Sequence, residues 1–354
     1  MKKSSFKLIG VMSGTSLDGI DITVAEFHFD EKIAYKILKA ETIPYEHHWK
    51  IKLSGAINSS EADLQSLNLE YTTYLADVLN QFIYRNNIVD LDAICSHGHT
   101  IKHEPQNGYT LQIGNYRQLA ANTGHTVVCD FRVQDVELGG QGAPLVPIGD
   151  RLLFPEFNFC LNLGGFANIS AEIKNQRIAY DICAVNTVLN FYAQKLDKEY
   201  DEGGKIAASG EFKEKLFNEL NRLHFYSEKP PKSLGVEWVN SEVLPLLKKY
   251  EEDIPSLLHT YSKHVGFQIS EVVKNSEGVK VLVTGGGAFN DFLINELKRI
   301  SSAEFVIPSE ELINYKEALI FAFLGALRLR GENNVLKSVT GAKKDHSSGR
   351  IYNP

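Results

Sequence analysis

The sequence predicts an α/β protein built from two similar halves, and two observations support this prediction. First, one order of elements occurs twice: strand, small-residue turn, strand, polar turn, strand. Second, apolar residues at helical spacing follow each of these runs, so that helices alternate with apolar strands. A repeat of this kind indicates duplication, with one domain for each copy and a cleft between them.

The first run lies near the N-terminus, where apolar residues and turn residues predict three strands in close succession. These strands cover residues 6–11, 20–28 and 33–41, with a polar turn at 30–32. A helix over 60–84 follows, because its apolar residues recur at helical spacing and Ser59 or Ser60 suits the N-cap position.

The second run repeats this order in the middle of the chain. Its strands cover 157–163, 167–173 and 177–182, with turns at 164–165 and 174–176. Later segments predict helices over 186–196, 211–223, 260–274 and 315–330, and an apolar strand over 279–283. The glycine-rich stretch 139–144 is the candidate boundary. We therefore expect a first domain over 1–131, with 331–354 packed back on it, and a second domain over 132–330.

The composition is that of an ordinary globular protein, and it excludes several functional classes. Of the 354 residues, 43% are hydrophobic and 23% are charged, and the net charge is −7. This acidic balance, without a basic run, argues against nucleic acid and membrane surfaces as partners. No signal peptide is predicted, and the most apolar helix candidate, 318–327, is too short to span a bilayer. Buried free thiols in a reducing cytoplasm are expected for Cys95, Cys129, Cys160 and Cys183.

The most informative segment is GVMSGTSLDGID, residues 10–21, in which a small-residue turn links two strands. Its glycines allow backbone N–H groups to approach an anion, and its serine and threonine hydroxyls add donors. We interpret it as a loop that grips a polyphosphate. Asp18 and Asp21 are candidates to hold a metal ion or to order the loop. A Gly/Ser hairpin turn is the alternative interpretation.

Three further glycine-rich or polar turns follow strand candidates, at 139–144, 163–165 and 284–287. Together with the first loop they suggest a nucleotide that lies across a cleft. The last turn is the most specific of the three, because an apolar strand delivers three glycines directly before a helix candidate. A tight strand-to-helix turn is the alternative there.

Asp181 is the best candidate for a general base. It lies at the end of the third strand of the second run, where a carboxylate can accept a proton from a hydroxyl or water. Its alternative role is an N-cap for the helix over 186–196.

Arg132 and a run of histidines could border a polar substrate. Arg132 is a fixed cation that can hold a carboxylate or phosphate, although an ion pair with Asp130, Asp135 or Glu137 is the alternative. In SHGHTIKH, residues 96–103, His97 and His99 could share a zinc ion. No acidic or thiol ligand has matching spacing nearby, so we favour a hydrogen-bonding wall for a polar substrate.

Taken together, these segments resemble the anhydro-N-acetylmuramic acid kinase family over essentially the whole chain. The most specific combination is GVMSGTSLDGID (10–21), DFRVQDVELGGQGAPLVP (130–147) and TGGGAFN (284–290). Supporting segments are SHGHTIKHEP (96–105), TLQIG (110–114), NLGGFANIS (162–170), YD (180–181), DEGGKIAASG (201–210), PPKSLGVE (230–237), EALIFAFLG (317–325) and TGA (340–342).

The resemblance implies the fold of the actin, sugar kinase and Hsp70 superfamily, in which two duplicated ribonuclease H-like domains flank a nucleotide cleft. It implies a cytoplasmic enzyme of peptidoglycan recycling that uses ATP and Mg²⁺. The enzyme opens the 1,6-anhydro ring of anhydro-N-acetylmuramic acid and phosphorylates O6, giving N-acetylmuramic acid 6-phosphate and ADP. Its partners are then ATP and a small amino sugar, with a homodimer as one conceivable assembly.

The resemblance also implies roles for individual residues. Asp181 takes a proton from the water that attacks the anomeric carbon, while O6 of the sugar attacks the γ-phosphate. His97, Arg132 and Glu317 border the sugar. No side chain is assigned as a metal ligand. The residues implied for the nucleotide are Ser13, Gly14, Thr15, Ser16, Asp18, Gly19, Gly164, Gly165, Gly285, Gly286 and Gly287.

The chain departs from the family pattern in two places. The family usually reads Asp-Thr-Gly-Pro-Gly-Asn where this chain has Asp181-Ile-Cys-Ala-Val-Asn186, and His99 stands where the family usually has Gln. These changes leave open a kinase of the same fold for another amino sugar. A nucleotide-binding regulator with weak ATPase activity is the alternative from a different class, and the pair of Asp181 and Arg132 favours an enzyme.

Overall fold

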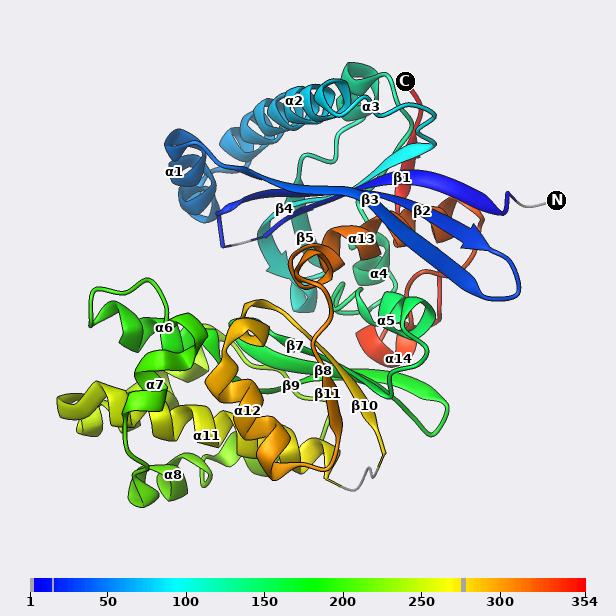
Figure 1. Ribbon diagram of the computed structural model, residues 1–354. Coiled ribbons are helices and arrows are strands. Elements are labelled where there is room, and N and C mark those ends of the chain that lie inside the picture. Colours follow the sequence, from blue (N-terminus) through cyan, green and yellow to red (C-terminus); the bar gives the residue numbers. More distant parts are fainter. Residues whose placement is uncertain (1–2, 15, 275–277) are drawn as a thin grey trace. The chain divides into compact units, whose positions relative to one another are not determined.

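The computed structural model describes residues 3–14, 16–274 and 278–354, and the chain divides into two compact units (Figure 1). The first unit comprises Met1–Leu153 with Tyr315–Pro354, and the second comprises Phe154–Asn314. Each unit contains its own mixed β-sheet with helices packed on it. The predicted α/β class and the duplication of the strand pattern are therefore confirmed.

The first unit contains a seven-stranded sheet in its described residues, in the order β12-β6-β4-β1-β2-β3, with β5 paired to β4. β1, β2 and β3 form an antiparallel meander, as predicted, while β4 and β6 continue parallel to β1. The bounds are β1 Ser5–Ser13, β2 Gly19–Phe29, β3 Ile33–Pro44, β4 Ala93–Glu104, β5 Tyr109–Ile113, β6 Val127–Cys129 and β12 Arg350–Tyr352.

Two long helices cover this sheet. α2 (Glu61–Arg85) follows the predicted N-cap Ser60, whose side chain accepts a hydrogen bond from the Asp63 backbone N–H, and its apolar face is buried. α13 (Glu310–Leu329) packs closely on β1, because a Cβ at Gly10 would lie 1.9 Å from the Ala318 carbonyl oxygen. Gly10 therefore serves the packing of this helix on the sheet.

Shorter helices complete the first unit: α1 His47–Gly55, α3 Gln118–Thr123, α4 Val133–Glu137, α5 Pro147–Leu153 and α14 Lys337–Thr340.

The second unit contains a five-stranded sheet in its described residues, in the order β11-β10-β7-β8-β9. β7, β8 and β9 form the second predicted antiparallel meander, and β10 and β11 run parallel to β7. Its strands are β7 Phe159–Leu163, β8 Phe166–Ile173, β9 Gln176–Ala184, β10 Lys280–Thr284 and β11 Glu304–Val306.

The helices of the second unit gather on one side of this sheet (Figure 1). Buried residues of α6, α11 and α12 join those of the strands in a single hydrophobic core. The helices are α6 Asn186–Gln194, α7 Lys205–Ser209, α8 Glu214–Leu220, α9 Val236–Trp238, α10 Leu244–Leu247, α11 Ile254–Val273 and α12 Asp291–Ile300.

The two compact units do not divide at the predicted positions. The glycine-rich stretch 139–144 lies within the first unit, since the Gln141 backbone N–H donates to the Thr340 carbonyl oxygen at 2.8 Å. The greater part of α13 also belongs to the first unit, because it packs against β1. The C-terminal segment lies on the same sheet, where β12 pairs with β6.

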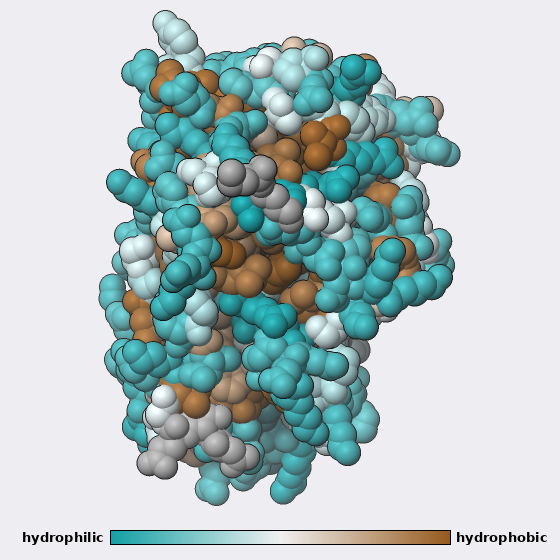
Figure 2. All heavy atoms as spheres, turned by 90° about the vertical axis from the view of Figure 1, so that its right-hand side faces the viewer, coloured by the Kyte–Doolittle hydropathy of each residue, from teal (hydrophilic) through white to brown (hydrophobic). Residues whose placement is uncertain are grey.

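The cysteines have the character that the sequence predicts. Cys95, Cys129, Cys160 and Cys183 are free and buried. Hydrophilic residues predominate on the face shown in Figure 2. Across the described residues, no helix combines the length and the apolar character that a membrane crossing requires.

Candidate active site

The first unit places its candidate residues at the carboxyl ends of neighbouring parallel strands, where ligands bind in open α/β sheets. Ser13 is the last residue of β1, His97 and His99 lie on β4, and Arg132 follows β6. Thr15 lies outside the described residues.

Ser13 does not present its hydroxyl to solvent as the phosphate-loop interpretation assumed. A bulge between β1 and β4 pairs Ser13 with His99, and Ser13 is only 3% exposed. Its Oγ lies 2.7 Å from His99 Nδ1 and 2.6 Å from the Tyr45 hydroxyl. Burial lowers the pKa of His99 to about 4, so this ring is neutral at pH 7. The Ser13 side chain therefore anchors the start of the loop to the core.

Asp18 orders the rest of this loop. Its carboxylate accepts hydrogen bonds from the Ser16 hydroxyl at 2.7 Å and from the Gly19 backbone N–H at 3.0 Å. Leu17, between them, has a φ of +59°, which is unfavourable for a branched side chain. Gly14 is half-buried, and a Cβ there would meet only Ser16 at ordinary contact distance. A Cβ at Gly19 would lie 2.5 Å from the Ile43 carbonyl oxygen, so the fold itself requires glycine there.

Asp21 is a half-buried carboxyl group beside this loop. It accepts a hydrogen bond from the Thr42 hydroxyl at 2.6 Å. Burial raises the pKa of Asp21 to about 6, and the nearby negative charges of Asp18 and Glu317 contribute to the same shift. The three carboxyl groups thus belong to one acidic region of the first unit.

Arg132 and His97 form a directional pair. The His97 Nδ1–H donates to the Gly98 carbonyl oxygen at 2.8 Å, which leaves Nε2 to accept from Arg132 Nε at 2.7 Å. Burial and the neighbouring Arg132 charge lower the pKa of His97 well below its usual value, so the ring is neutral. Arg132 Nη1 also donates to the Gly142 carbonyl oxygen at 2.7 Å.

The alternative ion pairs of Arg132 are not formed among the described residues. Asp130 pairs with Arg350 at 2.9 Å, and Asp135 accepts from the Gly142 N–H at 2.7 Å. Burial lowers the pKa of Arg132 to about 10, and the charge of Glu317 opposes this shift, while the charge of Arg132 in turn lowers the pKa of Glu317. Glu317 is reached by solvent but crowded by protein atoms, and this desolvation is the larger effect and raises its pKa.

The histidines of β4 do not assemble a zinc site. Both ring nitrogens of His97 are engaged with Gly98 and Arg132. Within 3–14, 16–274 and 278–354, no three His, Cys, Asp or Glu side chains are grouped to hold a metal ion. Neutral His97 and cationic Arg132 lie side by side, and a hydrogen-bonding wall for a polar substrate stays a prediction for this region.

The second unit brings two predicted glycine turns together at the ends of the adjacent parallel strands β7 and β10. A Cβ at Gly285, where φ is +81°, would lie 2.5 Å from Asn162 Oδ1, and a Cβ at Gly287 would lie 2.7 Å from Leu163 Cβ. These glycines are required for the two turns to touch. Gly286 is exposed, and a Cβ there would meet only Asn186 at 3.7 Å.

The turn at 164–165 also holds the start of α6. The Asn186 N–H donates to the Gly164 carbonyl oxygen at 3.2 Å, and the Val185 N–H donates to that of Gly165 at 2.8 Å. A Cβ at Gly165 would lie 2.8 Å from Thr187 Oγ1. Neighbouring protein atoms fill the Cβ positions of Gly165, Gly285 and Gly287, whereas Gly286 borders open space, which suits a flat ligand lying against its backbone.

Asp181 lies within β9, opposite Asn168 of β8 and beside a bulge. The N-cap alternative is wrong, because Val185 occupies the cap of α6. Asp181 is half-buried, and its Oδ2 accepts from the Leu234 backbone N–H at 2.8 Å. Burial raises the pKa of Asp181, while this hydrogen bond lowers it. None of the described residues donates to Oδ1, so that oxygen is available to a ligand.

The unusual residues after Asp181 have a packing role. β9 continues to Ala184, and Ile182, Cys183 and Val185 are buried in the core of the second unit. The Tyr261 hydroxyl donates to the Ala184 carbonyl oxygen at 2.9 Å. The departure from the family sequence therefore lies in the hydrophobic core.

The segment 230–235 was not assigned a role from the sequence, although its letters contribute to the resemblance. The Asp181 N–H donates to the Lys232 carbonyl oxygen at 2.9 Å, so this segment runs beside Asp181 and holds both its backbone N–H and its carboxylate. Lys232 Nζ donates to the Phe225 carbonyl oxygen at 2.8 Å and lies over the Phe225 ring. Backbone contacts of this kind leave no periodic signal in a sequence.

Comparison with known proteins identifies the family. A model of the family described as anhydro-N-acetylmuramic acid kinase matches residues 6–354. The chain belongs to this family.

Relatives in the anhydro-N-acetylmuramic acid kinase family match nearly the whole chain. A protein of that name from Sulfurimonas denitrificans is 33% identical over 373 residues, covering 97% of this chain and 98% of the relative. Another, from Haemophilus influenzae, is 33% identical over 374 residues and covers 97% of each chain. Among solved structures, a ROK family glucokinase from Streptomyces griseus is 11% identical, covers 90% of this chain and 98% of its own, and has a TM-score of 0.41. At this level of similarity, the glucokinase structure gives no information about the residues of the candidate site.

Proposed function

We propose that this chain is the ATP-dependent kinase that its family name describes, acting on anhydro-N-acetylmuramic acid in peptidoglycan recycling. The observation that carries the proposal is Asp181, a half-buried carboxylate with one oxygen held by a backbone N–H and the other available. Family membership over residues 6–354 supplies the substrate. A raised pKa makes this carboxylate a stronger base than an exposed aspartate.

Asp181 takes a proton from a water molecule as the water oxygen bonds to the anomeric carbon. The bond between that carbon and O6 breaks, and the electron pair stays on O6. O6 then bonds to the γ-phosphorus, and the bond from that phosphorus to ADP breaks. The products are N-acetylmuramic acid 6-phosphate and ADP. The backbone hydrogen bond from Leu234 fixes which way the carboxylate of Asp181 faces during this transfer.

The nucleotide lies against the bare glycine backbone in this proposal. In the second unit, 285–287 contact the adenosine and 164–165 contact the phosphates. In the first unit, the loop of residues 13–19 keeps the phosphate-binding role that the family resemblance implies. Gly286 supports this assignment, because its exposed Cα borders open space that a ligand can enter. The chemistry resembles that of other nucleotide sites in which main-chain groups contact the phosphates.

Mg²⁺ fits the acidic region of the first unit. The ion usually binds one or two carboxylates together with the phosphates of a nucleotide, so a dedicated cluster of protein ligands is not required. Asp18 and Asp21 would hold it. Burial is the main cause of the raised pKa of Asp21, and the added effect of the Asp18 charge supports their pairing at one ion. The ion would offset negative charge on the β- and γ-phosphate oxygens.

The sugar lies beside His97, Arg132 and Glu317 in this proposal. Neutral His97 directs Arg132 through its Nε hydrogen bond, and guanidinium N–H groups not bound to His97 or Gly142 can hold an anionic group. A cytoplasmic location agrees with free thiols. A homodimer is the assembly that we propose to test by light scattering.

The proposed chemistry is tested by running the reaction in ¹⁸O-labelled water. We expect label at the anomeric oxygen of a phosphorylated, reducing sugar, observed by mass spectrometry. Unlabelled product incubated in the same water for the same time controls for exchange through ring opening. A phosphorylated product that keeps its anhydro ring would show an ordinary hydroxyl kinase, and the absence of any sugar product would refute kinase activity on this sugar.

A further inference from the structure

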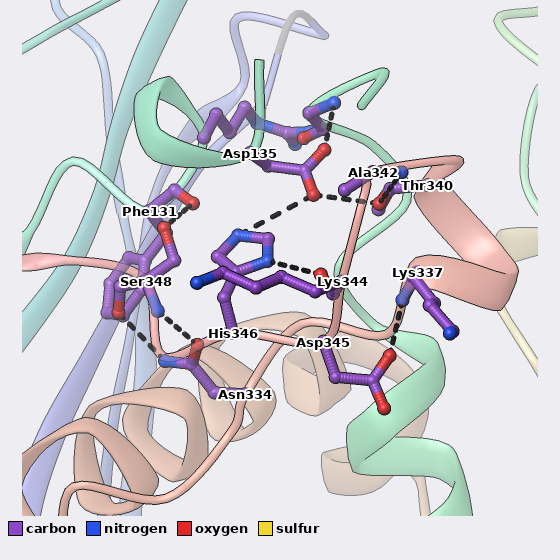
Figure 3. A network of polar contacts seen from close by, with 12 residues as sticks. Phe131, Asp135, Asn334, Lys337, Thr340, Ala342, Lys344, Asp345, His346 and Ser348 are labelled. Carbon is purple, nitrogen blue, oxygen red and sulfur yellow. Dashed lines mark hydrogen bonds and ion pairs between the residues drawn. The ribbon is translucent and has the colours of Figure 1, made fainter. Parts of the chain in front are cut away.

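The loop before Pro144 is fastened to the C-terminal segment through the carboxylate of Asp135 (Figure 3). Asp135 is fully buried. Its Oδ2 accepts from the Gly142 backbone N–H at 2.7 Å, and its Oδ1 accepts from the Thr340 hydroxyl at 2.7 Å. The Gln141 N–H donates to the Thr340 carbonyl oxygen at 2.8 Å. Thr340 therefore holds this loop through both its side chain and its backbone.

Gly142 connects Arg132 to the hydrogen bonds between Asp135 and Thr340. The Gly142 N–H is bound by Asp135, and the Gly142 carbonyl oxygen accepts from Arg132 Nη1 at 2.7 Å. A shift of Gly142 therefore moves the acceptor that directs the guanidinium. Because an arginine side chain has many rotamers, fixed acceptors are needed to keep it in one direction.

The C-terminal segment also holds the chain just before Arg132. The Ser348 hydroxyl donates to the Phe131 carbonyl oxygen at 2.6 Å, and Ser348 is tied to Asn334 by a backbone-to-side-chain bond of 2.7 Å (Figure 3). Both ends of the segment 132–142, which contains α4, are thus bound to residues within 334–348.

Gly140 shows that the fold makes room for the Asp135 carboxylate. A Cβ at Gly140 would lie 2.2 Å from Asp135 Oδ2. An alanine here would push the carboxylate away from Gly142. The glycines at 140 and 142 and the threonine at 340 therefore serve one arrangement, although they lie in two motifs far apart in the sequence.

We propose that Asp135 and Thr340 are positioning residues that set the direction of Arg132 toward the sugar. The inference rests on the proposed function, in which Arg132 borders the sugar. It gives the C-terminal TGA motif a role in sugar affinity, although nothing in the described part of that segment needs to touch the ligand.

The test compares Thr340→Val, which removes the hydroxyl, with Thr340→Ser, which keeps it. We expect Thr340→Val to raise the KM for the sugar about tenfold, the size expected when one hydrogen bond to a charged group is lost. The kcat and the KM for ATP should stay near those of the parent, and Thr340→Ser should restore the sugar KM. Gly140→Ala, which displaces the same carboxylate sterically, should give the same pattern. It serves as the second variant if Thr340→Val does not fold.

A double-mutant cycle separates failure of this inference from failure of the proposed function. If Thr340 acts through Arg132, its effect on the sugar KM disappears in an Arg132→Ala background. If Arg132→Ala leaves the sugar KM unchanged, the sugar-binding role of Arg132 is wrong. If Arg132→Ala raises the KM while folded Thr340→Val or Gly140→Ala does not, or if the two effects simply add, the positioning role is wrong.

Discussion

The two units hold their candidate functional groups in different ways. In the second unit, Asp181 is part of a strand and is oriented by backbone groups of Lys232 and Leu234. In the first unit, Arg132 follows a strand and is directed by His97 and by a chain of contacts through Asp135. A short side chain on a strand needs one neighbour to fix it, whereas a long flexible side chain needs several. The arrangement around Arg132 in the first unit therefore depends on side-chain identity at distant positions. The arrangement around Asp181 in the second unit depends on backbone hydrogen bonds.

The largest effect is expected for Asp181→Asn. The amide keeps the size of the side chain and can still accept from the Leu234 N–H, but it removes the base. Turnover should fall by about 10²–10⁴-fold, while ATP binding measured by calorimetry stays nearly intact. A variant that keeps most of its turnover would mean that Asp181 is structural and that the backbone-held group is not the catalytic one.

Gly286→Val tests whether the nucleotide contacts the glycine backbone of the second unit. The added side chain enters open space in the free protein, so the fold should tolerate it. A branched group there would occupy the space proposed for adenosine, and we expect ATP affinity to fall by about tenfold or more, which corresponds to about 1.4 kcal/mol. Sugar affinity should not change. An unchanged ATP affinity in the folded variant would remove this turn from the site.

Leu234→Pro tests the backbone hydrogen bond directly, because proline has no N–H. The N–H lowers the pKa of Asp181, so its loss should raise that pKa further. Loss of kcat/KM on the acid side should then begin at a higher pH, with a decrease of about fivefold near neutral pH for the loss of one hydrogen bond. Leu234→Ala retains the N–H and is the matched control. Identical pH profiles for the two variants would show that this bond does not tune the base.

The smallest effect on activity is expected for His99→Gln, which tests the side-chain network of the first unit. His99 is neutral at pH 7, and glutamine can accept from Ser13, so turnover should change little. The folded pKa of about 4 lies below the usual 6.5. Since the unfolded state binds more protons between these values, His99 reduces stability as pH falls from 6.5 toward 4.

Stability measurements between pH 4 and 6.5 distinguish the parent protein from the His99→Gln variant. At pH 5 the variant should gain about 2 kcal/mol of unfolding free energy over the parent, relative to their difference at pH 7.5. Denaturant unfolding at the two pH values measures this. Parallel pH profiles of stability would mean that His99 is not neutral in the folded protein.

Much of the secondary structure could be predicted from the sequence, because both meanders depend on local alternation and turn residues. The strands predicted over 33–41 and 177–182 correspond to β3 and β9. Division of the chain could not be predicted in the same way. The apolar pattern of α13 suits either sheet, and its place is decided by Gly10, whose missing side chain admits the helix.

The sequence predicted which residues belong to the candidate site, but it did not predict their hydrogen-bond partners. The burial of Ser13 depends on Tyr45 and His99, which lie on other segments and carry no joint signal. The alternative ion pair of Arg132 with Asp135 was wrong, because that carboxylate binds a loop N–H and a hydroxyl from the C-terminal segment. Such partners are set by the tertiary fold, which the order of residues does not reveal locally.

Three consecutive glycines follow β10, and their substitution should be tolerated to different degrees. The protein itself rejects a side chain at Gly285 and at Gly287, whereas it leaves room for one at Gly286. A library selected only for folded protein should therefore accept many residues at position 286 and few at its neighbours. The same library selected for growth on the substrate should retain glycine at all three. The difference between the two selections at position 286 measures what the ligand demands apart from what folding demands.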